Sequence, residues 1–214
     1  MSKHLIITIA RKYGSGGREI GEKVAALLGI KCYDRELITM AAERGNLSED
    51  ALARADEVAA GSLLYTLAMG STSYGMHAAP HGYRMPINDK LFYLQSDLVR
   101  EISAREDCVF VGRCADYVLR EEPCVLRVFV YGDDENRIAR IMQHHDIPRN
   151  KAVDLMNKTD HRRASYYNFY TGQKWGKHEN YSLAIDSYAL GMDGTAKMIA
   201  DFALALKYQN EKEN

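Results

Sequence analysis

Short apolar segments alternate with amphipathic segments along the chain. Apolar runs rich in β-branched residues occupy 5–10, 108–111 and 125–131, and shorter ones occupy 29–34 and 181–186. Such runs are typical of strands that are buried on both faces of a parallel sheet. Since helical patterns separate them, we predict an α/β protein, a three-layer α/β/α fold with a five-stranded parallel sheet.

Helices are predicted between these strands. Ile20, Val24, Leu27 and Leu28 share one helical face after the first strand. Acidic residues in a first turn and a proline at a helix start are further signals, found at 133–135 and at Pro148. The remaining helices are expected at 35–44, from Asn88 through Ile102, and from about Thr195 to Tyr208.

The chain changes character between residues 48 and 87. Ser48, followed by two acidic residues, predicts a helix start. Gly, Ser, Tyr, Met and His then dominate 61–87, and Pro80 and Pro86 interrupt regular structure. We expect a loop-rich excursion there, with a helical stretch at 62–69.

A glycine-rich loop follows the first strand. Gly14, Gly16 and Gly17 lie within four positions, and an amphipathic helix comes next. In a strand–loop–helix unit, unpaired backbone N–H groups and the helix dipole attract phosphate. An ordinary β–α connection would also use glycine, but the flanking Lys12 and Arg18 favour phosphate binding.

The loop departs from the Walker A sequence, which requires a lysine followed by a hydroxyl. With Gly14-Ser15-Gly16 aligned on the loop, Gly17 takes the position of the lysine, and Glu19 falls near that of the magnesium-binding hydroxyl. Arg18 or Lys12 could supply the missing cation. Glu19 either faces a metal ion or complements the helix dipole.

The overall charge excludes a general polyanion binder. The chain has 28 Lys and Arg against 29 Asp and Glu, a net charge of −1, so we expect no nucleic-acid partner. It lacks an apolar run of 18 residues and begins directly with a strand, so we expect no membrane partner and a cytoplasmic protein.

The cysteines indicate buried thiols. Four are present, and none are in C-x-x-C spacing, so neither a disulfide framework nor a zinc site is expected. The histidines are scattered, and we assign no metal site made of protein ligands.

Basic residues gather late in the chain. Residues 137–163 contain seven Lys or Arg against three Asp. Asp160 and Arg163 share a helix face, which is consistent with a surface ion pair as well as with a functional role. The aromatic cluster at 166–170 could likewise be core packing. Phosphoryl transfer would unite these features, because it depends on positioning and on cations around the transferred group.

The order of the motifs resembles the cytidylate kinase-like family, within the P-loop nucleoside monophosphate kinase group. The matching segments are 7–11, 14–21, 33–36, 111–116, Glu135-x-Arg137-x-x-Arg140, Asp160-x-x-Arg163-x-x-Tyr166-Tyr167 and 182–187. The resemblance implies a single domain over 1–214. Its core would comprise 1–33, 105–143 and 181–214, with a helical monophosphate-binding insertion at 34–104 and a lid at 144–180.

The resemblance also implies roles for individual residues. The phosphates of ATP, with Mg²⁺ carried by the nucleotide, would contact the loop and its neighbours: Lys12, Gly14, Ser15, Gly16, Gly17, Arg18 and Glu19. The acceptor would contact Asp34, Arg35, Arg113, Arg140 and Arg162. Catalysis would involve Arg18, Arg137, Asp160 and Arg163. Cys114 departs from the pattern, because it replaces the Asp of a Gly-Arg-Asp motif.

The first hypothesis is therefore an ATP- and Mg²⁺-dependent kinase acting on a nucleoside monophosphate, CMP or dCMP. A second is a P-loop sensor that binds a nucleotide or another phosphoanion without turnover, which the altered loop favours. A third is a kinase of another small metabolite, since segment 61–87 could reshape the acceptor pocket. A homodimer formed through 61–87 is a further hypothesis.

Overall fold

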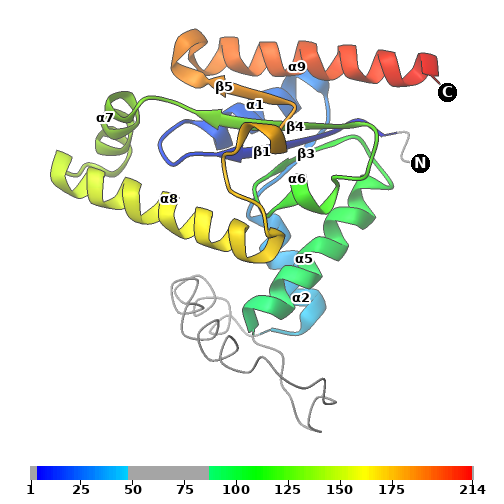
Figure 1. The fold of residues 1–214 in the computed structure, drawn as a ribbon, viewed down its shortest axis with the longest axis horizontal. Coiled ribbons are helices and arrows are strands. Elements are labelled where there is room, and N and C mark those ends of the chain that lie inside the picture. The colour runs from blue at the N-terminus through cyan, green and yellow to red at the C-terminus, as the bar shows by residue number, and fades with distance from the viewer. Residues whose placement is uncertain (1–3, 48–86, 214) are drawn as a thin grey trace, which may run out of the picture.

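The computed structural model describes residues 4–47 and 87–213. Its five strands form one parallel sheet in the order β2-β3-β1-β4-β5, so that the first strand lies in the centre (Figure 1). The strands are β1 (Ile6–Arg11), β2 (Lys31–Tyr33), β3 (Cys108–Val111), β4 (Val125–Tyr131) and β5 (Leu183–Asp186). The predicted five-stranded parallel sheet is confirmed.

Helices cover both faces of the sheet. The helices in the described residues are α1 (Gly17–Leu28), α2 (Glu36–Gly45), α5 (Ile87–Ser103), α6 (Ala115–Val118), α7 (Asp134–His145), α8 (Arg149–Thr171) and α9 (Ser187–Glu213), with a short 3₁₀ helix, η1 (His178–Asn180). Alternation along β1 explains the layers, because successive side chains point to opposite faces. Ile7 and Ile9 pack with α1 and α9, whereas Ile6 packs with α2, α5 and α6.

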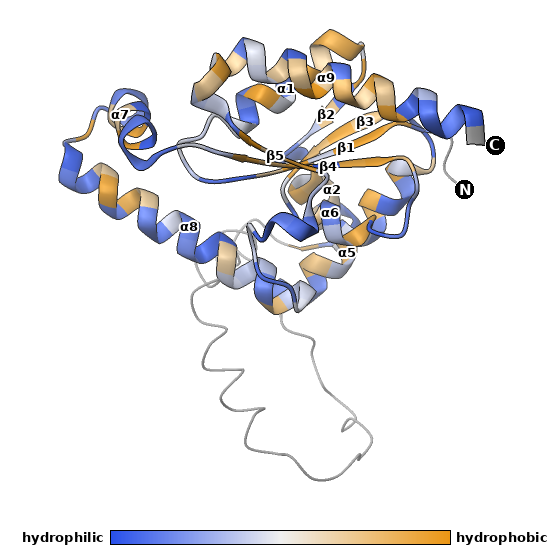
Figure 2. Ribbon diagram, turned by 45° about the horizontal axis from the view of Figure 1, so that its top comes forward, coloured by the Kyte–Doolittle hydropathy of each residue, from blue (hydrophilic) through white to orange (hydrophobic). Residues whose placement is uncertain are grey.

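The helices α7 and α8 differ from those that cover the sheet. Figure 1 shows α7 beyond the carboxyl ends of the strands, while α8 runs beneath the sheet toward α5. Figure 2 shows that both are mainly hydrophilic, in contrast to the hydrophobic strands. A ring stack of Phe92 on α5 with Tyr170 on α8, at 4.2 Å between centroids, joins the two helices.

The last helix begins earlier than predicted. It starts at Ser187, directly after β5, and the backbone of Gly191 is not helical, with φ of 68°. The helix predicted from about Thr195 corresponds to the part of α9 that follows this kink, and the turn at 187–190 that precedes it was not predicted. Strand β2 is also shorter than predicted, and the four-residue α6 was not predicted.

Several predictions lie outside the described residues: the helix start at Ser48, the helix at 62–69 and the loop-rich character of 61–86. The homodimer hypothesis, which depends on that segment, stays a prediction. All four cysteines are free, and Cys108, Cys114 and Cys124 are buried, as expected. Within 4–47 and 87–213, no helix has the length and apolar character needed to cross a membrane.

Candidate active site at the glycine-rich loop

A cleft of about 920 Å³ opens at the carboxyl ends of the strands. Its volume suits a small-molecule ligand, and in open α/β sheets ligands bind at this edge. Most of the predicted site residues line it: Lys12, Gly14, Gly16, Gly17, Arg18, Glu19, Asp34, Arg35, Arg113, Arg140, Arg162 and Arg163. Ser15, Arg137 and Asp160 are not part of its lining.

The glycine-rich loop, Gly14–Arg18, presents unpaired backbone amides. The amide of Ser15 donates to the carbonyl of Lys12 at 3.3 Å, and that of Ile20 donates to Gly16 at 2.9 Å. In the described part of the chain, the amides of Gly14, Gly16, Gly17 and Arg18 make no hydrogen bond. Gly16 precedes the first residue of α1, so these donors coincide with the positive end of the helix dipole. The arrangement is an anion site.

The carbonyl groups of the same loop are bonded on its other side. Those of Tyr13, Gly14 and Ser15 accept hydrogen bonds from Arg137 Nε at 2.7 Å, Tyr188 Oη at 2.8 Å and Ser187 Oγ at 2.7 Å. Because these three carbonyls have side-chain donors, the peptide units that follow them are held with the carbonyl side toward the protein. Ser187 and Tyr188 were not among the predicted site residues.

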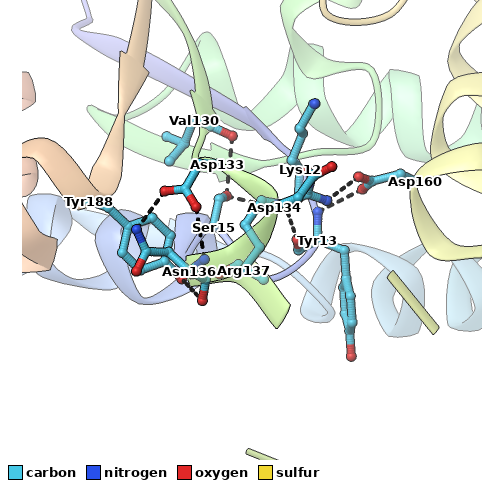
Figure 3. A network of polar contacts seen from close by, with 11 residues as sticks. Lys12, Tyr13, Ser15, Val130, Asp133, Asp134, Asn136, Arg137, Asp160 and Tyr188 are labelled. Carbon is cyan, nitrogen blue, oxygen red and sulfur yellow. Dashed lines mark hydrogen bonds and ion pairs between the residues drawn. The ribbon is translucent and has the colours of Figure 1, made fainter. Parts of the chain in front are cut away.

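A buried ion pair holds the start of the loop, as Figure 3 shows. Arg137, with only 2% of its side chain exposed, is paired with Asp160, and Asp160 Oδ1 accepts from the amide of Tyr13 at 2.7 Å. Side chains from α7 and α8 therefore bind both backbone groups of Tyr13. The ion pair proposed from spacing between Asp160 and Arg163 does not form; Arg163 Nη1 instead donates to the carbonyl of Arg11 at 2.9 Å.

Gly14 lies against the backbone of α7. Its φ is +80°, and a Cβ atom there would lie 2.8 Å from the carbonyl oxygen of Arg137. Glycine relieves both the backbone strain and the clash. Ser15 is fully buried, with Oγ 2.8 Å from the Lys12 carbonyl and 3.2 Å from that of Val130. Its hydroxyl is thus directed into the protein, away from the cleft.

Arginines from separate parts of the chain meet at the loop. Asp34 lies 3.6 Å from Arg11 and 3.4 Å from Arg18, and Arg18 also pairs with Glu22 at 3.0 Å. Burial lowers the pKa of Arg163, and the same cause, reinforced by neighbouring arginines, lowers that of Arg11 to about 9. Both shifts mean that burial disfavours the charged form of these side chains. Arg11 was not among the predicted site residues.

Glu19 has a partner from α7. Arg140 Nη2 lies 2.6 Å from its carboxylate, and Lys23 lies 3.6 Å away. Glu19 stands in the first turn of α1, where a negative charge is favourable. Among the residues that the structure describes, no group of three or more His, Cys, Asp or Glu is placed to hold a metal ion.

Backbone strain is concentrated at Arg113. Gly112, Arg113 and Cys114 follow one another with φ of 78°, 58° and 55°. A left-handed backbone is costly for residues other than glycine, and such strain is found mostly at functional sites. The turn brings Arg113 to the cleft and starts α6 immediately after it.

Aromatic residues form one wall of the cleft. Tyr166, Tyr167 and Trp175 line it, so the cluster is more than core packing. The Tyr167 hydroxyl donates to Asp116 at 2.8 Å. Asp116 is 4% exposed, and burial raises the pKa of its carboxyl group despite the hydrogen bond from Tyr167. Asp116 and Trp175 were missed as site residues, because neither has a distinctive spacing in the sequence.

Comparison with known proteins agrees with this geometry. The sequence matches the cytidylate kinase-like family over residues 6–189. A comparison with curated proteins gave no match. A solved structure of an uncharacterized protein from Eubacterium ventriosum ATCC 27560 superposes with a TM-score of 0.68 at 25% identity, covering 94% of this chain and 98% of the other.

A shikimate kinase from Bacteroides thetaiotaomicron gives a TM-score of 0.51 at 12% identity, covering 92% of this chain and 97% of the other. This likeness concerns the fold alone. The family match spans the sheet, the glycine-rich loop and the arginines of α7 and α8. The chain therefore belongs to the cytidylate kinase-like family, and its fold is that of the P-loop kinases.

Proposed function

We propose that this protein transfers the γ-phosphoryl group of ATP to a nucleoside monophosphate, CMP or dCMP. The observation that carries the proposal is the set of unpaired amides of Gly14, Gly16, Gly17 and Arg18 at the start of α1, facing a cleft that arginines line. Phosphoryl transfer requires this combination of positioning and positive charge, and little else from the protein.

The donor phosphates fit the loop side of the cleft. The free amides would bind their oxygens, with Lys12 and Arg18 as cations at the loop's edges and Ser15 shaping the loop from behind. Mg²⁺ bound to the nucleotide would neutralise phosphate charge during transfer. Since Glu19 is bonded to Arg140, we assign it to the helix terminus and to the placement of that arginine.

The acceptor fits between the loop and the aromatic wall. Arg35, Arg113 and Arg162 would bind its phosphate together with Arg140, and the rings of Tyr166 and Trp175 would contact the base. Asp34 would orient the arginines beside it. An acceptor phosphate oxygen then bonds to the γ-phosphorus as the bond to the β–γ bridging oxygen breaks, which yields ADP and a nucleoside diphosphate.

Arg163 and Arg18 would stabilise charge on the transferred group, because both line the cleft near the loop. We assign Arg137 and Asp160 to positioning, since their contacts are with Tyr13 and with each other. In this proposal 34–104 is the monophosphate-binding insertion and 144–180, which contains α8, is the lid. The remaining segments form the core of a single domain.

Measurement of ADP formation tests the proposal. The protein is incubated with ATP, Mg²⁺ and each nucleoside monophosphate in turn, and in parallel with shikimate and gluconate as non-nucleotide acceptors. We expect ADP release that depends on CMP or dCMP. Turnover with a non-nucleotide acceptor alone would overturn the assignment of the acceptor.

A nucleotide sensor without turnover is the second candidate, favoured by the glycine at position 17 where P-loop kinases have lysine. Thermal unfolding separates the two. Stabilisation by ATP or CMP, together with an absence of ADP formation with every acceptor, would identify the sensor.

A further inference from the structure

The side chain of Arg11 occupies the space beside Gly17. Arg11 is the last residue of β1 and lines the cleft, and its side chain is 19% exposed. A Cβ atom at Gly17 would lie 2.5 Å from Cβ of Arg11 and 2.8 Å from its Cγ. Such distances exclude a side chain at position 17 while Arg11 is present. The missing lysine and the arginine stem are therefore two aspects of one packing arrangement.

The guanidinium group crosses from the loop to the end of β3. A Cβ atom at Gly112 would lie 1.9 Å from Nη1 of Arg11 and 3.0 Å from Cζ. The charged group thus reaches the end of β3, next to Arg113. The carbonyl of Arg11 accepts from Arg163 at 2.9 Å, which holds its backbone in place.

The hydrogen-bonding capacity of Arg11 is incompletely used. Its Nε atom is buried and, among the described residues, has no hydrogen-bond partner. Asp34 lies 3.6 Å from Nη2, which is an ion-pair distance and too long for a hydrogen bond. Arg18, by contrast, is 55% exposed and bonded to Glu22. The Nη groups of Arg11 also make no hydrogen bond among the described residues, so Arg11 offers an anionic ligand in the cleft more unused donors than Arg18 does.

From these contacts we infer that Arg11 is the cation that binds the donor polyphosphate in place of the usual P-loop lysine, its stem lying where a lysine from position 17 would begin. The inference rests on the proposed function and names the residue that recognises the triphosphate. A guanidinium can bridge two phosphate oxygens through parallel N–H groups, whereas an ammonium acts as a point charge.

Exchange of the two positions tests the inference. The variants are Arg11→Met, which keeps the apolar stem against Gly17, Gly17→Lys, and the double variant Arg11→Gly/Gly17→Lys, which removes the Cβ and Cγ atoms at position 11. Arg100→Ala, at an exposed arginine of α5, is the matched control. The readout is the dissociation constant of inorganic triphosphate with Mg²⁺, measured by calorimetry, alongside circular dichroism to verify folding.

Arg11→Met is expected to fold and to weaken triphosphate binding by about tenfold to a hundredfold, the effect of losing a hydrogen bond to a charged group. Gly17→Lys should lower the unfolding temperature because of the clash. The double variant relieves that clash, so it should recover most of the lost stability and most of the affinity. Unchanged affinity in Arg11→Met, or no recovery in the double variant, would overturn the inference.

The triphosphate-binding measurement, together with the assay of ADP formation, separates this inference from the proposed function. If wild-type protein forms ADP and Arg11→Met binds triphosphate equally well, the inference fails and the kinase stands. If wild-type protein binds triphosphate through Arg11 and forms no ADP with any acceptor, the inference stands and the kinase fails.

Discussion

Nε of Arg137 donates a hydrogen bond to the carbonyl oxygen of Tyr13 at 2.7 Å, although the two residues are 124 positions apart. Asp160 completes the contact by accepting from the amide of Tyr13 and pairing with Arg137. The geometry of the glycine-rich loop is therefore set by two helices outside the sheet. Substitutions in α7 and α8 should therefore alter the conformation of the loop.

Arg137→Met tests this dependence. Loss of one partner leaves Asp160 largely buried without its counter-charge, so we expect a loss of about 3–5 kcal/mol in the free energy of unfolding. At this chain length that corresponds to a decrease of roughly 6–20 °C in unfolding temperature. Chemical denaturation measures the first quantity and calorimetry the second.

Asp160→Asn is the companion to that variant, because its amide oxygen can still accept from Tyr13. A double-mutant cycle of the two substitutions should give a coupling energy of about 1 kcal/mol or more. Additive effects would show that the pair does not hold the loop. At temperatures where both variants are folded, triphosphate affinity should also fall in Arg137→Met.

Tyr188→Phe should loosen the loop without altering the sheet. The variant removes the donor to the Gly14 carbonyl and keeps the ring, so we expect about 1 kcal/mol of lost stability. Because the freed carbonyl allows the Gly14–Ser15 peptide to rotate, triphosphate binding should weaken by more than adenosine binding. Equal weakening for both ligands would show that the hydroxyl does not orient the loop.

Because the backbone at Arg113 is strained, we expect substitutions there to change the stability of the protein and its affinity for CMP independently. Arg113→Ala keeps the left-handed strain, whereas Arg113→Gly relieves it, so the glycine variant should be the more stable of the two by about 1 kcal/mol. Both should lose affinity for CMP to the same degree, since each lacks the guanidinium. Denaturation curves and CMP titration provide the two measurements. A glycine variant no more stable than the alanine variant would contradict the strain argument.

The buried carboxyl group of Asp116 should make the stability of the protein depend on pH. Burial raises the pKa of its carboxyl group in the folded protein. The folded state therefore binds a proton more readily than the unfolded state, and stability falls as pH rises from about 4, the ordinary Asp value, through the folded-state pKa. Asp116→Asn retains an acceptor for Tyr167 and removes the titration, so it should be the more stable protein at pH 8.

Thermal unfolding of wild type and Asp116→Asn between pH 4.5 and 8.5 checks this expectation. The two curves should diverge with rising pH, with the variant the higher. Parallel curves would mean that Asp116 does not titrate with a raised pKa in the folded state.

The hydrophobic pattern was sufficient to predict the sheet, because β1, β3 and β4 consist mainly of buried apolar residues between polar turns. It was insufficient at the start of α9, where Gly191 breaks the helix after one turn. The arginines at strand ends could be predicted as a group, since parallel strands end at one edge. Their individual partners could not, because Asp160 pairs with Arg137 on another helix rather than with Arg163 on its own.

The role of Arg11 likewise could not be predicted from the sequence. In the sequence it is the last residue of a strand, and Lys12 and Arg18 are equally basic neighbours of the loop. It is distinguished by the packing of its stem against Gly17 and by its unused hydrogen-bond donors, which only the structure shows. Ser187 and Tyr188 likewise gain their roles from the position of β5 beside β4, which brings them to the carbonyls of the loop.

The most direct measurement concerns the amides of the glycine-rich loop. In ¹H–¹⁵N NMR spectra of the protein titrated with ATP and Mg²⁺, we predict large downfield proton shifts for Gly14, Gly16, Gly17 and Arg18, with a smaller shift for Ser15, whose amide is already bonded. Resonances of these four residues that stay unchanged while ATP binds elsewhere, or does not bind, would contradict the account.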